Sequence, residues 1–125
     1  MTGARSAIWA LACLAAAPAH AEGPLPGGET IRAMLIAHDI AYGAIAWERH
    51  EANGVLLHRS SEGPVARTSL GEWRMDGAAR CLRWTRAMDW ECYAVALEGT
   101  PPETIRFEDP FGNVSTGRLM PRGAE

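Results

Sequence analysis

The sequence predicts a mainly β protein: a single curled antiparallel sheet, either a small barrel or a sandwich, of about 6–8 strands with one short N-terminal helix. Three observations predict this class. Apolar residues follow helical spacing only around residue 31, they alternate with polar residues from Tyr42 onward, and turn signals separate the alternating runs at regular intervals. Short alternating strands at such intervals are typical of antiparallel sheets that curl onto themselves.

Residues 1–21 have the three parts of a secretory signal peptide. Arg5 supplies the positive charge, residues 8–17 form an apolar run, and Ala19 and Ala21 place small residues before the expected cleavage site. The run has about ten residues, whereas a membrane-spanning helix needs roughly 20. We therefore expect a periplasmic or secreted protein with no membrane span after the signal is removed.

The rest of the chain divides into a linker and one domain. Residues 22–28 are rich in Gly and Pro and predict a flexible linker, and residues 29–125 have the length of a single β domain. A lipoprotein signal that ends at Cys13 is the alternative to cleavage after Ala21.

The composition excludes several classes of function. The chain has 12 basic and 15 acidic residues, and the loss of Arg5 with the signal changes the net charge from −3 to −4. This acidic balance argues against nucleic-acid binding, which needs a basic surface. The chain contains no Lys, so Schiff-base chemistry and phosphate loops built on Lys are excluded.

Residues 29–37 predict the helix. Ile31, Met34 and Leu35 have the spacing of one helix face. A helix of two to three turns is too short to be stable alone, so it depends on contacts with the rest of the domain. His38 and Asp39 are expected at the end of this helix, where a cation also favours the helix dipole.

Seven segments predict strands. Turn-forming residues such as Asn53-Gly54, Asp76-Gly77 and residues 109–112 separate them. The segments are 42–51, 54–60, 65–75, 80–85, 90–97, 103–108 and 113–120.

Asn53-Gly54 is the strongest local turn signal. A two-residue type I′ turn at this pair is expected to place Ala52 opposite Val55. The same register pairs Glu48 with Arg59, Arg49 with His58, and His50 with Leu57. It sends the side chains of His50 and His58 to opposite faces of the sheet.

Cys81 and Cys92 are the two cysteines that follow the signal. An exported protein enters an oxidising compartment, so we expect a disulfide. In a hairpin of residues 80–85 and 90–97 the two cysteines face each other, with about 4.5–5.5 Å between their Cβ atoms. We expect the bridge to stabilise the fold by about 3 kcal/mol.

Alternation around the cysteines assigns two faces to this hairpin. The expected core face carries Leu82, Trp84, Tyr93, Val95 and Leu97. The other face carries Cys81, Arg83, Trp90, Cys92, Ala94 and Ala96. Trp73 and Met75 are expected to join one of these two clusters.

These residues also carry a resemblance. The motifs are Gly71-x-Trp73, the turn Asp76-Gly77, Cys81-x-x-Trp84, Cys92-Tyr93 and the late turn Asp109-x-x-Gly112. On these motifs, and over roughly residues 29–120, the chain resembles a group of small exported proteins of Gram-negative bacteria, most of them domains of unknown function. The resemblance implies a fold and a compartment, but it assigns no active-site residue.

The sequence contains no recognisable catalytic motif. The patterns Gly-x-Ser-x-Gly, His-Glu-x-x-His and Cys-x-x-Cys-His are absent, and so is a phosphate loop. A metal site or a general base needs side chains that converge, and the expected register separates His50 from His58. We therefore expect no enzyme activity, no metal and no cofactor.

The chain is unusually rich in tryptophan, with five Trp and only two Phe residues. Trp73 and Trp84 are expected to fill the core. Trp90, together with Arg86 and Met88 of the neighbouring loop, and Trp47 are the candidates for contact with a partner or ligand.

The expected function is that of a periplasmic, non-enzymatic binding or interaction domain, with a periplasmic protein or a cell-wall component as its partner. One alternative is a calycin-like carrier of a small apolar ligand, although about 100 residues leave little room for a cavity of a few hundred Å³. The other is an inhibitor of a cell-wall or protein hydrolase that inserts Arg86 or Met88 into its target.

Overall fold

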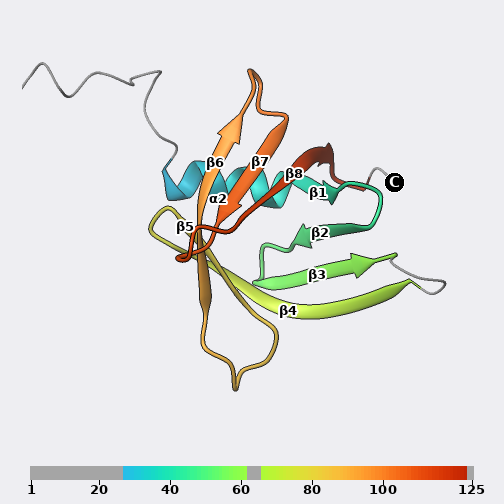
Figure 1. Cartoon of the computed structure of the whole chain (residues 1–125), viewed down its shortest axis with the longest axis vertical. Coiled ribbons are helices and arrows are strands. Elements are labelled where there is room, and N and C mark those ends of the chain that lie inside the picture. Colours follow the sequence, from blue (N-terminus) through green and yellow to red (C-terminus); the bar gives the residue numbers. More distant parts are fainter. Residues whose placement is uncertain (1–26, 62–65, 124–125) are drawn as a thin grey trace, which may run out of the picture.

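The computed structural model describes residues 27–61 and 66–123, which form a closed eight-stranded antiparallel β-barrel with one helix (Figure 1). Each strand pairs with its neighbours along the chain, and β1 also pairs with β8, which closes the barrel. The predicted fold class is confirmed, and of its two predicted forms the structure is the barrel rather than the sandwich. The elements are α2 (Gly28–Ala37), β1 (His38–Tyr42), β2 (Ala46–His50), β3 (Val55–Ser60), β4 (Arg67–Asp76), β5 (Ala79–Arg83), β6 (Glu91–Glu98), β7 (Thr104–Glu108) and β8 (Val114–Pro121). The expected signal peptide lies outside the described residues, and so does the expected linker except for its last two positions.

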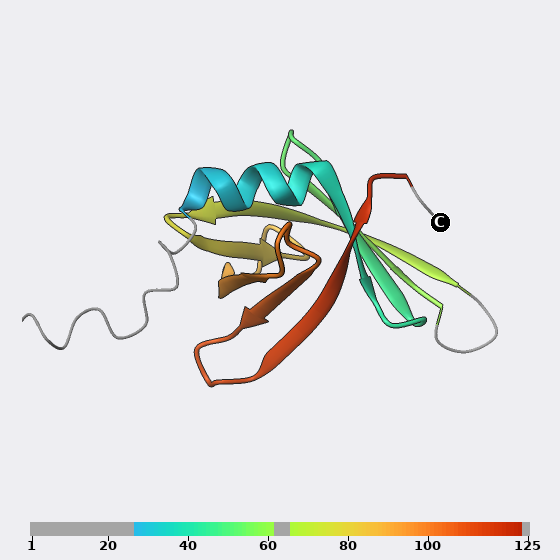
Figure 2. The ribbon, with the colours of Figure 1, turned by 90° about the horizontal axis from the view of Figure 1, so that it is seen from above.

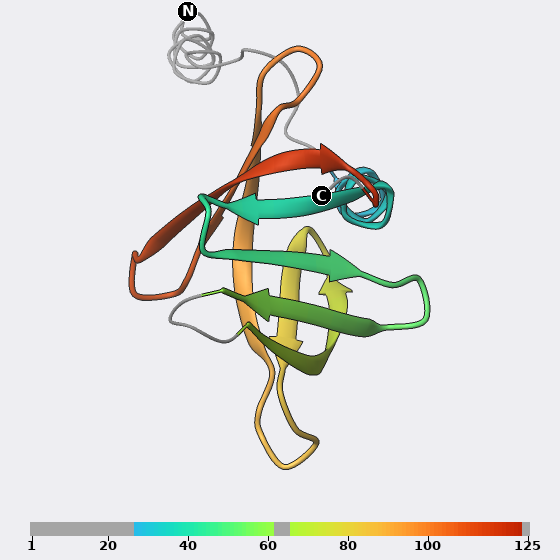
Figure 3. The same cartoon turned by 90° about the vertical axis from the view of Figure 1, so that its right-hand side faces the viewer.

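Helix α2 closes the end of the barrel at which β1 begins and β8 ends (Figure 3). Its buried residues Ile31 and Leu35 join the hydrophobic core of the barrel, as their spacing predicts. The helix begins at Gly28, inside the expected linker, because the absence of a side chain lets Gly28 pack against the backbone of Gly77. Within the described ranges, no helix is long and apolar enough to cross a membrane.

Strand β1 is the element that the sequence prediction missed. The predicted strand 42–51 is in fact the end of β1, a turn and β2, and His38–Tyr42 is a strand rather than a helix end. Helix α2 passes into β1 without a Gly or Pro between them, so no local signal marks the boundary. Pairing with β2 on one side and with β8 on the other holds β1 in the extended conformation.

The register of the first hairpin differs from the predicted one by one residue. Glu48 pairs with His58, and His50 pairs with Leu56. The turn has three residues rather than two: the amide of Gly54 donates to the carbonyl of Glu51, and Gly54 has a φ of 94°. A type I turn followed by a glycine with positive φ is the usual three-residue hairpin. The shift places His50 and His58 on the same face, so their predicted separation is wrong.

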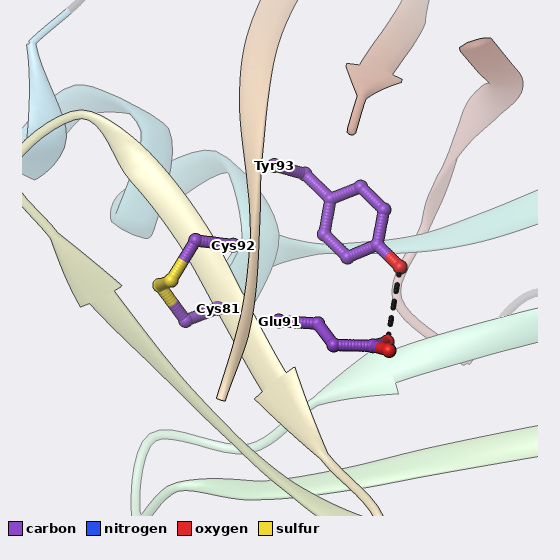
Figure 4. Close-up of a disulfide and its surroundings, with 4 residues drawn as sticks. All are labelled: Cys81, Glu91, Cys92 and Tyr93. Atoms are coloured by element: carbon purple, nitrogen blue, oxygen red, sulfur yellow. Dashed lines mark hydrogen bonds between the residues drawn. A yellow bond between two sulfur atoms is a disulfide. The ribbon is translucent and has the colours of Figure 1, made fainter. Parts of the chain in front are cut away.

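The cysteine hairpin confirms the predicted pairing. Cys81 lies directly opposite Cys92 between β5 and β6, and a disulfide joins them. Figure 4 shows the disulfide on one side of β6 and the side chains of Glu91 and Tyr93 on the other. The bridge therefore leaves the inward face of this hairpin to other side chains.

The core lies inside the barrel and under α2. The predicted core face of the cysteine hairpin is confirmed, since Leu82 is buried and Tyr93 packs against the same core. Trp73 is 2% exposed and belongs to this core, whereas Trp84 is only partly buried. The Trp84 ring lies over Gly71, where a Cβ would come within 2.7 Å of a ring carbon. Gly71 thus makes room for Trp84 near the end of the barrel that α2 does not cover.

Candidate functional site

A cavity of about 290 Å³ occupies the open end of the barrel, opposite α2. Side chains from β1, β2, β3, β5, β6, β7 and β8 converge on it, because every second residue of each strand points inward. Its lining combines aromatic and charged residues: Tyr42, Ala46, Glu48, His58, Arg80, Leu82, Trp84, Glu91, Tyr93, Phe107 and Ser115. Figure 2 shows how the strands diverge on the side of the barrel away from α2.

Glu48 is the centre of a buried hydrogen-bond network in the floor of this cavity. The carboxylate accepts a hydrogen bond from the Tyr42 hydroxyl at 2.8 Å and one from Arg80 at 3.2 Å, both on Oε1. Its Oε2 lies 3.2 Å from Nδ1 of His58. Burial by itself raises the pKa of Glu48, but the His58 hydrogen bond, the Arg80 charge and the Tyr42 hydroxyl together lower it to about 2. Glu48 is therefore ionised throughout the physiological range.

Arg80 is a buried cation that the fold surrounds with aromatic rings. It is 3% exposed, and its guanidinium carbon lies 3.8 Å from the ring centroid of Phe107 and 5.3 Å from that of Tyr93. Its Nη1 is also 3.3 Å from Nε2 of His50. The Nε of Arg80 and the Nδ1 of His50 are both buried without a hydrogen-bond partner. Such buried unpaired groups are costly and rare in folded proteins.

His50 is neutral in this environment. Burial, followed by the positive charge of Arg80, lowers the pKa of His50 to about 3. Because Arg80 has only N–H donors, His50 accepts through Nε2 and carries its hydrogen on the unpaired Nδ1. The ring stands edge-on to Trp73, with 4.9 Å between the centroids.

His58 connects the buried network to the open end. The hydrogen bond with Glu48, opposed by partial burial, raises the pKa of His58. The His58 side chain is 29% exposed, and its ring stands nearly perpendicular to Trp84 with 5.8 Å between the centroids. His58 is the part of the charged network that is most accessible from outside, since the Glu48 and Arg80 side chains are 9% and 4% exposed.

The turns at the open end of the barrel carry exposed apolar side chains. Ile45, Met88, Phe111 and Val114 are exposed, and all four lie in or next to turns at the open end. In the described residues no exposed large apolar side chain lies in the turns at the closed end. Exposed apolar side chains are therefore a feature of the open end, whose cavity has a charged floor.

The residues predicted from the sequence as contact sites lie outside this cavity. Trp90 is half-buried, with the guanidinium carbons of Arg74 and Arg83 each 4.3 Å from its ring centroid. Trp47 lines a groove of about 290 Å³ on the outer wall, together with Met120 and other residues of β1, β2 and β8.

Arg86 and Met88 lie in the β5–β6 loop, which extends away from the barrel (Figure 1). The Arg86 side chain is 86% exposed, and Met88 is 43% exposed. Arg86 and Met88 thus lie on a projecting loop, apart from the buried network and outside the cavity lining.

A cluster of Tyr42, Glu48, His58 and Arg80 was not predicted from the sequence. A signal was present for Arg80, because it alternates with Leu82 and therefore belongs to the predicted core face. Charged residues at inward positions of a strand are uncommon unless they are paired. Glu48 and His58 were not recognised as neighbours because the predicted register of the first hairpin was wrong by one residue.

The cysteines do not form a metal centre. In the described part of the chain, one group of metal-ligand side chains lies close together: Asp76, Cys81 and Cys92. Both sulfur atoms of this group are joined in the disulfide, so neither is a thiolate that could bind a metal.

The fold and the cavity define this chain as a small, closed β-barrel with one helix-capped end and one open end. No protein-family model, no curated protein and no solved structure matches it. The resemblance to small exported proteins of Gram-negative bacteria thus remains an expectation from the sequence motifs.

Proposed function

We propose that this protein is a non-enzymatic binding module that takes a small molecule into the open end of its barrel. The cavity of about 290 Å³ carries this proposal, because its aromatic walls end on a buried charged floor. Ligand sites are typically apolar clefts with a few placed polar groups, and mouths of β-barrels are a common position for them. The volume lies near the lower end of the usual range, so the ligand is small.

The chemistry of the floor modifies the carrier alternative drawn from the sequence. A carrier of a purely apolar ligand needs an apolar lumen, because burial of an ionised group against hydrocarbon is costly. Here Glu48 and Arg80 form part of the lining. The ligand that fits best has an apolar or aromatic body and a polar end.

The disulfide supports a periplasmic or secreted location. Bridges between structural cysteines persist mainly in oxidising compartments. A buried Cys81 joined to Cys92 is the arrangement expected of such a protein. Together with the signal-like residues 1–21, it favours export.

Binding at the mouth can be tested with N-phenyl-1-naphthylamine, a neutral aromatic probe whose fluorescence rises when it leaves water. We expect one probe molecule to bind per chain. Ser115→Trp should weaken binding by at least about tenfold, because Ser115 lies in the cavity lining and the indole occupies the mouth.

Thr116→Trp is the matched control. Thr116 pairs with Arg106 and therefore faces outward, whereas its neighbour Ser115 pairs with the inward-facing Phe107. The control variant should bind the probe as the unchanged protein does. Equal binding by all three proteins, or no binding by any, would contradict a ligand site in the cavity.

The hydrolase-inhibitor alternative is favoured by one observation, the exposure of Arg86 and Met88 on the projecting β5–β6 loop. If this alternative is right, an equimolar amount of the protein should slow the lysis of cell walls by lysozyme. Arg86→Ala with Met88→Ala should weaken inhibition by at least about tenfold, as expected for central interface residues. Arg106→Ala, on strand β7 rather than on this loop, should leave inhibition unchanged. Undiminished lysis at equimolar protein would exclude lysozyme as a target.

A further inference from the structure

We infer that the ligand of the open-end cavity carries an oxyanion, and that the His58 imidazolium binds this group through Nε2. This inference rests on the proposed function and deepens it, because it names the chemical class of the ligand. Three properties of the cavity support it: the hydrogen-bond groups that remain unused, the balance of charge, and the position of His58.

The buried polar atom of the cavity lining that has no hydrogen-bond partner is a donor. The acceptor oxygens of Glu48 already receive hydrogen bonds from Tyr42, Arg80 and His58. Among the residues that line the cavity, Arg80 has an Nε–H that is buried without a partner. A floor with an unpaired donor, and with a carboxylate that already takes part in three hydrogen bonds, favours a ligand group that only accepts, which is the property of an ionised carboxylate or phosphate.

The charge of the floor has the matching sign. Glu48 supplies one negative charge, and Arg80 and protonated His58 supply two positive charges. An added anion brings these charges to neutrality, whereas an added cation increases the imbalance in a site of low dielectric. The aromatic rings that face Arg80 partly screen its charge but supply no counter-ion.

His58 is placed to make the direct contact. Its Nδ1 is held by Glu48, so a doubly protonated ring presents Nε2–H as a free donor, and no described residue bonds to Nε2. The same hydrogen bond with Glu48 fixes the orientation of the ring. Arg80 lies deeper and is 3% exposed. It therefore attracts an entering anion through its charge, whereas His58 makes the first direct contact.

The other titratable groups that share the cavity with His58 do not provide a competing anion in the floor. They are Tyr42 from β1, Glu48 from β2, Arg80 from β5, and Glu91 and Tyr93 from β6. Burial is the main cause that raises the pKa of both tyrosines, so neither is ionised near neutrality. Glu91 is exposed, and its carboxylate accepts the Tyr93 hydroxyl at 3.3 Å.

The experiment titrates the full protein with three compounds of the same shape and different charge: benzoate, benzamide and benzylamine. Binding is followed by NMR through the ring signals of His58 and the backbone amides of Ala46 and Ser115, so that it does not depend on the fluorescent probe. At pH 6 we expect benzoate to bind at least about tenfold more tightly than either other compound. Phenyl phosphate is added as a fourth compound to separate carboxylate from phosphate recognition, and preference for either oxyanion supports the inference.

The variant His58→Gln keeps a hydrogen-bonding side chain but removes the charge, and the ratio of benzoate to benzamide affinity should fall below about threefold. In the unchanged protein the same ratio should decrease as the pH rises through the pKa of His58, since the imidazolium loses its proton. Arg59→Gln is the matched control, because it removes a positive charge from the adjacent, outward-facing position of the same strand. That control should keep the full ratio.

The outcomes separate this inference from the proposed function. Equal binding of all compounds, or a preference for benzylamine, would overturn the oxyanion assignment while N-phenyl-1-naphthylamine still bound in the cavity. Loss of the benzoate preference in Arg59→Gln would assign it to the general field of the protein and also overturn the role of His58. Failure of the neutral probe and of all four charged or neutral benzene derivatives to bind in the cavity would refute the proposed function itself.

Discussion

Replacement of Glu48 by Gln will lower the free energy of unfolding by about 3–5 kcal/mol. Glu48 is 7% exposed, and its carboxylate is the partner of the buried Arg80 guanidinium. The substitution preserves the shape of the side chain but leaves the Arg80 charge without a counter-ion in the barrel. Removal of one partner of a buried pair is much more costly than loss of the pair itself. Urea denaturation at neutral pH measures the change.

Two further variants identify the cause of this loss. Glu108→Gln removes a carboxylate from the exposed pair with Arg106, whose closest N–O distance is 3.9 Å, and should cost less than about 1 kcal/mol. The double variant Glu48→Gln, Arg80→Met removes both buried charges and should be more stable than Glu48→Gln alone. A double variant that is less stable than the single one would contradict an uncompensated charge as the cause.

The loss also depends on pH in a defined direction. The pKa of Glu48 is about 2 in the folded protein, below the ordinary value of 4.5, so its ionisation stabilises the fold above about pH 4.5. This contribution disappears as the pH falls from about 4.5 to about 2, because the carboxyl becomes protonated in both states. The stability difference between the unchanged protein and Glu48→Gln should therefore shrink over this range. A constant difference would show that the charge of Glu48 is not the source of the effect.

Loss of the disulfide will be the second large effect. The bridge between Cys81 and Cys92 closes a loop of roughly 12 residues, for which the chain-entropy model gives about 3 kcal/mol. Cys81→Ala with Cys92→Ala should lower the urea midpoint accordingly, and a reductant should lower that of the unchanged protein but not that of the double variant. Peptide mass spectrometry should find both thiols protected from alkylation until reductant is added. Rapid alkylation of either thiol in the folded, unreduced protein would contradict the bridge.

The cysteine hairpin was predictable because its signals are local. Alternation of apolar and polar residues fixes which side chains share a face, and the two cysteines then require one register. The same reasoning assigned Leu82 and Tyr93 to the core face, and both belong to the core or pack against it. In contrast, β1 lacks a local boundary, because His38–Tyr42 directly follows the helix and is defined by strands far away in the sequence.

Prediction of the candidate site depended on the turn between β2 and β3. Asn53-Gly54 correctly indicated a hairpin, but both a two-residue and a three-residue turn accommodate Asn and Gly there. The choice between them moves His58 from one face of the sheet to the other, because side chains alternate with a period of two. With the observed register, Glu48 and His58 become direct neighbours.

By itself, the sequence determined the fold class, the single short helix, the disulfide and the inward face of its hairpin, since each follows from spacing within a few residues. The tertiary structure decided that the sheet closes between β1 and β8, that α2 covers one end, and that the other end holds a charged cavity. The physical reason is the distance along the chain between the parts. Glu48 and Arg80 are brought into contact only by closure of the barrel. Both side chains are buried there, and each charge is tolerated inside the barrel because the other neutralises it.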